Sequence, residues 1–297
     1  MDLKILTKKL DAYERLMRLD KPIGILLLLW PTLWALWIVT RGKPDWIVLL
    51  IFITGTVLMR SAGCVMNDIA DRKYDGLVER TKNRPLATGE VSVKEAYGLA
   101  IFLALLAFCL VLQFNMTTIL LSFAALFLAV TYPLTKRFLA IPQAYLGIAF
   151  GFGIPMVFAA VNDYIPPLAW VLLVANILWA IAYDTEYAMV DRDDDLKIGI
   201  KSSAIFFGKH DVIAIMICYA IMISLLVYIG NFMSYGKYYY LGLGVATGLA
   251  IGQYEQIKKR LKTDCFKAFL HNNWIGLAIF IGLVAQYLAT YSQLPNN

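Results

Sequence analysis

The sequence predicts an all-α, polytopic membrane protein with nine transmembrane helices around a central cavity that opens to the cytoplasmic side. Hydrophobic residues make up 60% of the 297 residues, whereas charged residues make up only 16%. The mean hydropathy is +0.66, and a soluble globular domain usually carries about 25% charged residues. The surplus apolar surface must face something other than water, so the lipid bilayer is the first partner that the composition implies.

Nine apolar runs approach the length of about 20 residues that a membrane helix needs. They cover residues 23–39, 46–66, 95–114, 117–135, 142–161, 165–183, 211–230, 237–254 and 273–291. No Ser/Pro-rich linker divides the chain, which predicts a single domain over 1–297. The first 22 residues are charged and amphipathic, unlike a cleavable signal peptide.

The placement of basic residues predicts the orientation of these spans. Of 27 lysines and arginines, 23 lie in the N-terminal segment and in alternate loops, and 3 lie in the other loops. Positively charged short loops stay in the cytoplasm, so we expect a cytoplasmic N-terminus and a periplasmic C-terminus. The net charge of +6 is thereby explained by topology, and no nucleic-acid partner is expected.

The chain also resembles two related halves. The second and sixth spans each end in an acidic cluster, about 117 residues apart, that is followed by a long cytoplasmic loop. This arrangement suggests two pseudo-repeated four-helix halves with a ninth helix appended.

The acidic clusters are the strongest chemical signal. In the first, Asn67, Asp71 and Asp75 are spaced i, i+4, i+8, which on a helix places them on one face. In the second, Asp184, Asp191 and Asp195 are spaced i, i+7, i+11, which also gives one face. Stacked like charges destabilise a helix, so a compensating cation is expected. Mg²⁺ prefers oxygen ligands and commonly bridges carboxylates to substrate phosphates.

The predicted metal ligands follow from the two clusters, with two neighbouring acids as helpers: Asn67, Asp68, Asp71, Asp75, Asp184, Asp191 and Asp195. Basic residues beside them, among them Arg80 and Lys82, are suited to a phosphate. Each is otherwise explained as a topology-setting charge, although Lys136 and Arg137 occupy the only short cytoplasmic loop between the acidic halves. Arg60 lies inside a span, where an arginine is costly and usually functional.

These motifs resemble the UbiA family of intramembrane aromatic prenyltransferases: NDxxDxxxD from Asn67, DxxxD from Asp191, and nine spans. Five further stretches are similar to the bacterial members that act on 4-hydroxybenzoate. They are RLDKPIG from Arg18, LWPTLWA from Leu29, AGC from Ala62, NRPL from Asn83, and the run from Ala182 to Ile200.

The resemblance implies a Mg²⁺-dependent enzyme of the bacterial inner membrane. It would transfer a polyprenyl group from a polyprenyl diphosphate to the 3-position of 4-hydroxybenzoate, an early step towards ubiquinone. The expected catalytic residues are Asp71, Asp75, Asp191, Asp195 and Arg60. The expected substrate-binding residues are Asn67, Arg60, Arg72, Lys73, Arg84, Tyr132, Lys136, Arg137 and Lys197.

Two alternatives stay open at this stage. A related prenyltransferase would accept another aromatic compound. A membrane transporter would place coupling acids near the midplane of the bilayer, whereas these acids cluster at one edge.

Overall fold

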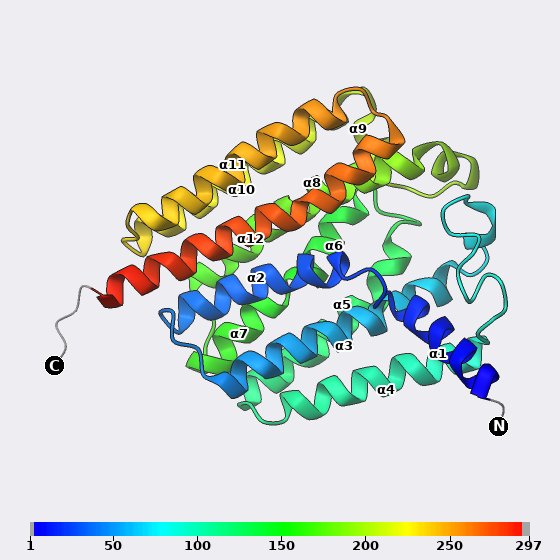
Figure 1. Ribbon diagram of the computed structural model, residues 1–297, viewed down its shortest axis with the longest axis horizontal. Coiled ribbons are helices and arrows are strands. Elements are labelled where there is room, and N and C mark those ends of the chain that lie inside the picture. Colours follow the sequence, from blue (N-terminus) through cyan, green and yellow to red (C-terminus); the bar gives the residue numbers. More distant parts are fainter. Residues whose placement is uncertain (1–2, 293–297) are drawn as a thin grey trace.

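A computed structural model describes residues 3–292. All secondary-structure elements of these residues are helices, and they include no strand. The helices pack side by side in one bundle (Figure 1). They are α1 (Leu3–Met17), α2 (Ile23–Val39), α3 (Trp46–Asp71), α4 (Val93–Val111), α5 (Met116–Thr135), α6 (Pro142–Gly151), α7 (Gly153–Asn162), α8 (Pro167–Ile198), α9 (Ser203–Phe207), α10 (Asp211–Phe232), α11 (Lys237–Ile257) and α12 (Lys262–Ser292), with short 3-10 helices η1 (Asp75–Leu77) and η2 (Gly208–His210).

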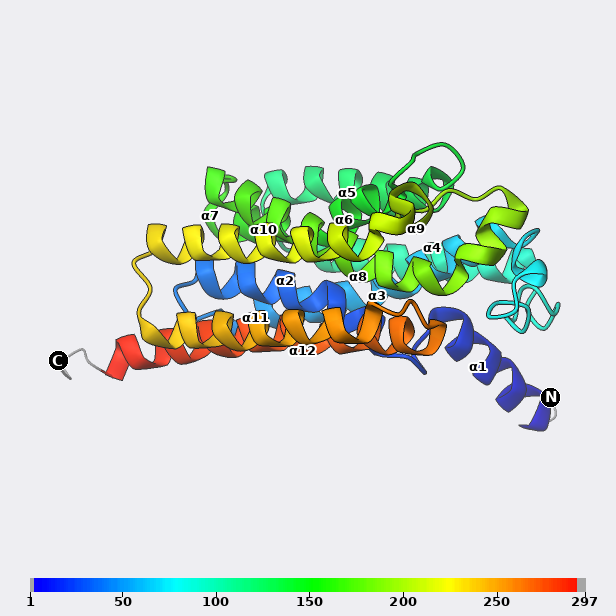
Figure 2. The ribbon, with the colours of Figure 1, turned by 90° about the horizontal axis from the view of Figure 1, so that it is seen from above.

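The long helices run along a common direction, and α1 diverges from them at one end (Figure 2). All nine predicted runs are helical. Within residues 3–292, seven helices are long and apolar enough to cross a membrane, with α6–α7 counted as one and α9–α10 as another. This is a multi-pass membrane protein. The helices α2 and α11 do not meet the same criterion, so the count of nine stays a prediction.

Side-chain caps explain where several helices begin. The Asp45 carboxylate accepts hydrogen bonds from the backbone N–H groups of Ile47 and Val48 at the start of α3. Ser92 and Glu95 form a capping box at the start of α4. Such caps satisfy backbone donors that have no partner within the helix. They start α3 at Trp46, where the predicted span begins, and α4 at Val93, two residues before the predicted span.

The predicted span over 142–161 is interrupted, which corrects the expectation of one continuous helix. The helix α6 ends at Gly151 and α7 begins at Gly153. Pro155 lacks a backbone N–H and its ring clashes with the carbonyl four residues earlier, which is that of Gly151. A Cβ atom at Gly153 would lie 2.6 Å from the Thr32 hydroxyl, so the break also lets this segment approach α2 closely.

The main hydrophobic core joins α2, α7, α8, α10, α11 and α12. At its centre the rings of Trp34 and Trp179 stack with centroids 5.3 Å apart. A smaller core joins α1, α3 and α4. The helix that holds the sixth predicted span, 165–183, extends well beyond it, because α8 continues to Ile198. This extension keeps the second acidic cluster on a rigid helix.

Candidate active site

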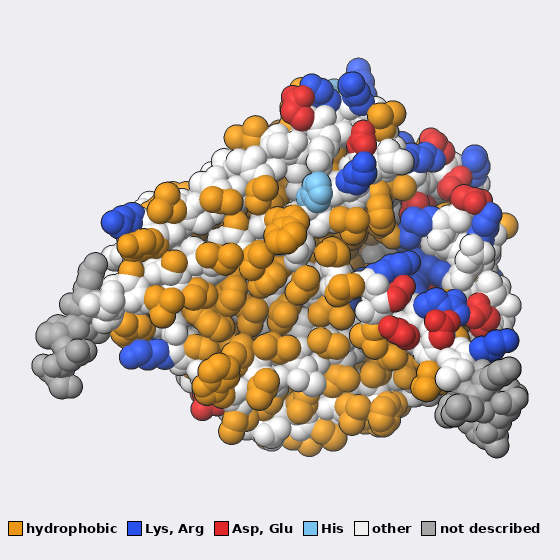
Figure 3. All heavy atoms as spheres, viewed as in Figure 1, with side chains coloured by type: hydrophobic (Ala, Val, Ile, Leu, Met, Phe, Trp, Pro, Cys, Tyr) orange, Lys and Arg blue, Asp and Glu red, His pale blue; other side chains and the backbone are white. Residues whose placement is uncertain are grey.

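Charged side chains gather at one end of the molecule, over α1, the loop after α3 and the end of α8, while hydrophobic side chains cover the middle of the bundle (Figure 3). Both acidic clusters belong to this end. The opposite end carries few charges on the face shown. The chemistry of the two clusters is therefore confined to one edge of the apolar region.

The first cluster is not a single helical face, so that prediction is wrong for Asp75. The helix α3 ends at Asp71, and Asp75 begins η1. The Arg84 guanidinium lies 3.0 Å from both the Asp68 and the Asp75 carboxylates. The turn after α3 therefore brings Asp75 back towards the helix end, and Arg84 reduces the like-charge repulsion that a continuous helix would stack.

Burial makes the Asp75 carboxyl group harder to ionise. Removal from water raises the pKa of Asp75 to about 6, and the Arg84 guanidinium opposes this effect. The neighbouring carboxylates of Asp68 and Asp71 add to the rise. A raised pKa means that this group holds its negative charge less readily than an exposed aspartate, as expected where several acids share a small volume.

The second cluster does lie on one helix, as predicted. Asp184, Asp191 and Asp195 are all carried by α8. The Arg80 guanidinium contacts both oxygens of the Asp191 carboxylate, with a shortest distance of 2.6 Å. Because Arg80 follows η1, this ion pair joins the loop of the first cluster to the helix of the second.

A second basic residue also joins the two clusters. Lys136, at the end of α5, forms an ion pair with Asp71 and interacts electrostatically with Asp195. The backbone N–H of Lys201 donates to the Lys136 carbonyl at 2.9 Å, which holds the segment after α8 against the end of α5. The two acidic rows thus converge on one region, separated by cationic side chains.

The residues present suit a hard divalent cation. Asp71 Oδ1 is buried and has no hydrogen-bond partner among the described residues. Asp71 and Asp68 both lie near enough to Asp75 to act on its charge, and carboxylate oxygens are ligands that Mg²⁺ prefers. Within residues 3–292, no three acidic, histidine or cysteine side chains lie close enough to enclose an ion by themselves. The donor set therefore fits an ion that takes its remaining ligands from a bound phosphate or water.

Arg60 lies deeper in α3 than the acids. Its guanidinium donates to Cys64 Sγ at 2.7 Å and lies 5.4 Å from the centre of the Phe150 ring. It also interacts electrostatically with Asp184. Arg60 Nε is buried and has no hydrogen-bond partner in the part of the chain described, so this cation retains an unused donor.

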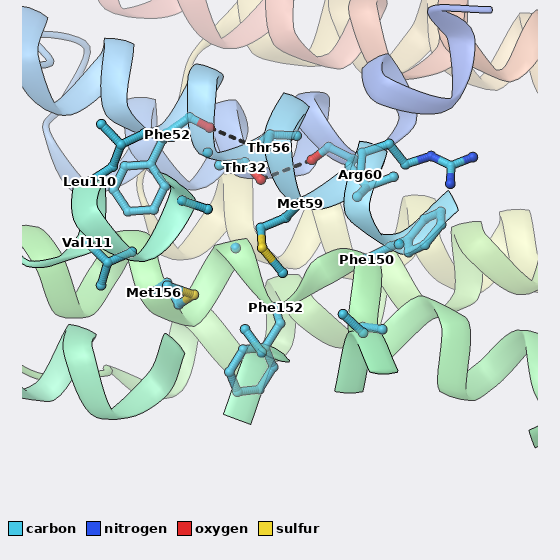
Figure 4. Close-up of a pocket in the computed structure, with 18 of the residues that line it drawn as sticks. Thr32, Phe52, Thr56, Met59, Arg60, Leu110, Val111, Phe150, Phe152 and Met156 are labelled. Atoms are coloured by element: carbon cyan, nitrogen blue, oxygen red, sulfur yellow. Dashed lines mark hydrogen bonds between the residues drawn. The ribbon is translucent and has the colours of Figure 1, made fainter. Parts of the chain in front are cut away.

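A cavity lined largely by apolar side chains extends from Arg60 between α2, α3, α4, α5, α6 and α7. In Figure 4 the Arg60 guanidinium lies at one end, while Phe52, Leu110 and Val111 line the other. Tyr132, a predicted substrate-binding residue, lines the same cavity.

The other predicted residues differ in their placement. Arg137 donates to the Ala70 carbonyl at 2.8 Å, beside the first cluster. Arg72 donates to the Ile69 carbonyl, and Arg72 and Lys73 are both exposed at the end of α3. Lys197 is 72% exposed and pairs with Asp194, so the structure does not bring it into contact with either cluster.

Two arginines form ion pairs with predicted metal ligands, and the sequence predicted neither pair. Arg80, which the sequence marked only as suited to a phosphate, binds Asp191. Arg18 donates to both oxygens of Asp68, at 2.9 and 2.8 Å, so this predicted metal ligand is held between two arginines. The sequence signal for Arg18 was its place in the RLDKPIG stretch, but spacing alone does not relate it to an aspartate 50 residues away.

The model of the UbiA prenyltransferase family matches residues 28–283. A relative from Methylobacillus flagellatus, named 4-hydroxybenzoate octaprenyltransferase, is 64% identical over 94% of this chain and 95% of its own length. A relative of the same name from Azoarcus sp. is 63% identical over 95% of this chain and 99% of its own length.

Solved structures have the same fold. The apo structure of a UbiA homolog from Aeropyrum pernix is similar with a TM-score of 0.78 and 25% identity, over 88% of this chain and 97% of that one. A UbiA homolog from Archaeoglobus fulgidus bound to GPP and Mg²⁺ has a TM-score of 0.66 over 92% and 99% of the two chains. At 19% identity the latter likeness concerns the fold alone. The chain belongs to the UbiA prenyltransferase family, as its acidic motifs indicated.

Proposed function

We propose that this protein transfers a polyprenyl group from a polyprenyl diphosphate to the 3-position of 4-hydroxybenzoate in a Mg²⁺-dependent reaction. The observation that carries the proposal is the convergence of two acidic clusters, joined by Lys136 and Arg80, next to a long apolar cavity. The names of the relatives, 4-hydroxybenzoate octaprenyltransferase, support this acceptor.

The metal would be held between the clusters by Asn67, Asp71 and Asp75 on one side and by Asp191 and Asp195 on the other. When bound, Mg²⁺ supplies Lewis-acid stabilisation of the negative charge on the diphosphate. Lys136 and Arg80 carry positive charge into the same region and are suited to neutralise diphosphate oxygens. Fixed charges of this kind stabilise charge that develops in a transition state.

The reaction exchanges one bond for another. The allylic carbon–oxygen bond breaks and the diphosphate leaves with the electron pair. The ring carbon ortho to the phenol then bonds to the allylic carbon, and the ring loses its proton. The apolar walls of the cavity, including Phe52 and Met59, would exclude water from the reactive carbon.

The cavity suits the prenyl tail, because its lining is largely apolar and it lies within the membrane-spanning helices. Arg60, with its unused donor, would bind the carboxylate of the aromatic acid, since an arginine pairs well with a carboxylate. We further propose that the charged end faces the cytoplasm of a bacterial inner membrane and that the end of α12 faces the periplasm, as the basic loops predict.

The test is a mass-spectrometric assay of membranes with 4-hydroxybenzoate, a polyprenyl diphosphate and Mg²⁺, with and without EDTA. We expect product that disappears with EDTA and with Asp191→Ala at normal expression. Asp193→Ala is a matched control, because Asp193 is 65% exposed and pairs with Lys262. Full activity of Asp191→Ala would remove Asp191 from the site, and a panel of other aromatic acceptors would identify a different substrate.

A further inference from the structure

Glu186 is a fully buried carboxyl group on α8 that the reaction does not use. Its hydrogen-bond donors come from three other helices. Tyr219 of α10 donates to Oε1 at 3.1 Å, and Asn272 of α12 donates to Oε2 at 2.8 Å. With its amide nitrogen turned towards Glu186, Gln253 of α11 donates at 2.5 and 3.0 Å.

Hydrogen bonds alone hold this side chain. Within the described part of the chain, no lysine, arginine or histidine forms an ion pair with Glu186. The Trp179 indole donates to Asn272 Oδ1 at 2.9 Å, which fixes the orientation of the Asn272 amide. A buried polar group that loses such partners bears its full desolvation penalty, so the network has one strongly preferred arrangement.

Glu186 lies on the face of α8 opposite the acidic cluster. Successive residues turn by about 100° around an α-helix, so Glu186 and Asp184 are about 160° apart and Glu186 and Asp195 about 180° apart. Any rotation of α8 about its axis that moves Asp184 or Asp195 also moves Glu186 out of its three hydrogen bonds. One side of the helix is therefore fixed while the other presents its carboxylates to the site.

We propose that Glu186 is a positioning residue: its hydrogen bonds to Tyr219, Gln253 and Asn272 fix the rotation of α8 and thereby the positions of Asp184, Asp191 and Asp195. The inference rests on the proposed function, because it assumes that these carboxylates hold the metal ion. Glu186 itself touches neither substrate nor metal.

The test measures binding of Mn²⁺, used in place of Mg²⁺, to the purified full chain in the presence of inorganic diphosphate, by electron paramagnetic resonance. Glu186→Leu keeps the volume but removes the hydrogen bonds, and we expect it to weaken Mn²⁺ binding about tenfold. Glu186→Gln keeps hydrogen-bonding capacity and is expected to bind within about twofold of the unaltered protein. Tyr219→Phe is a milder change on α10, and its Mn²⁺ affinity is expected to lie between those of Glu186→Leu and Glu186→Gln.

The control is Asn176→Leu, which removes a buried hydrogen bond of the same helix, from Asn176 to the Gly147 carbonyl. It is expected to lower the melting temperature without changing the Mn²⁺ affinity of the folded protein. Unchanged affinity in both Glu186→Leu and Tyr219→Phe, or equal weakening in Glu186→Gln and Glu186→Leu, overturns the inference. Absence of Mn²⁺ binding in the unaltered protein overturns the proposed function instead.

Discussion

Gly24 has no side chain and so leaves space for the Arg60 guanidinium, which lies at one end of the cavity. A Cβ atom at Gly24 would lie 2.7 Å from one of its terminal nitrogens. Gly24 closes the RLDKPIG stretch, and this contact gives a physical reason for a glycine there. The position of an intramembrane cation thus depends on a residue of another helix that has no chemistry of its own.

Gly24→Ala is expected to displace Arg60 and to raise KM for 4-hydroxybenzoate several-fold, with a smaller effect on KM for the prenyl diphosphate. Steady-state assays with each substrate varied in turn measure both constants. Gly98→Ala is the control, because no atom outside its own helix lies within 4 Å of a Cβ there. If Gly24→Ala raises both constants equally, Arg60 does not bind the aromatic acid.

Among the individual residues, spacing identified the members of both acidic clusters but not their partners. Asp71 and Asp191 could be singled out because they recur at helical intervals next to apolar spans. The pairing of Arg18 with Asp68 and of Arg80 with Asp191 could not be predicted, because these contacts join segments 50 and 111 residues apart. Such pairs depend on how the helices pack, which hydrophobic periodicity does not specify.

The loop between α3 and α4 is organised around Arg84, which joins Asp68 on the helix to Asp75 in η1. The Thr81 hydroxyl also donates to the Asp75 carbonyl at 2.8 Å. The loop therefore has a defined shape that keeps Asp75 beside the end of α3. A helix end followed by an ordered loop thus replaces the continuous acidic helix that the spacing predicted.

Arg84→Met is expected to release this loop, because two buried carboxylates lose their shared cation and breaking a buried pair typically costs about 3–5 kcal/mol. Limited proteolysis should cut the loop faster than in the unaltered protein, and activity should fall. Lys82→Met is the control, since Lys82 pairs with the exposed Glu79. Equal cleavage of the two variants would show that Arg84 does not hold the loop.

Helix positions were the most predictable elements, because runs of apolar residues long enough to span a bilayer are rare in other contexts. The break at Phe152 was missed although Pro155 stands in the sequence, because proline is tolerated in many membrane helices. The apolar run of the sixth span ends at 183, but the helical spacing of Asp184, Asp191 and Asp195 indicated that the helix continues beyond it, as α8 does. The ion pair between Arg80 and Asp191 offsets part of the repulsion between these acids.

For the molecule as a whole, the proposed reaction requires a cavity that accepts a prenyl chain inside the bundle. Gly55 lines this cavity, and no atom outside its own helix lies within 4 Å of a Cβ there. Gly55→Phe is expected to shorten the cavity, so turnover with a long prenyl diphosphate falls at least about tenfold relative to a short one.

The matched control is Gly244→Phe on α11, where a Cβ atom also meets nothing within 4 Å and the residue does not line the cavity. Competition between a short and a long prenyl diphosphate in one reaction gives the ratio of long-chain to short-chain turnover directly. An unchanged ratio in Gly55→Phe would place the prenyl chain elsewhere.

The fold class and the family followed from the sequence, since composition, span positions and two acidic motifs are all local features. The convergence of those motifs at one end of the bundle is a property of the assembled helices. The pseudo-repeat of two four-helix halves stays a prediction, as does the orientation of the chain in the membrane.

A calorimetric titration of the purified protein with inorganic diphosphate in the presence of Mg²⁺ tests whether the two acidic clusters form one metal–diphosphate site. Asp71 and Asp195 belong to different helices, α3 and α8. We expect Asp71→Asn and Asp195→Asn each to weaken Mg²⁺-dependent diphosphate binding about tenfold or more. Binding as tight as in the unaltered protein in either variant would contradict a site shared by the two clusters.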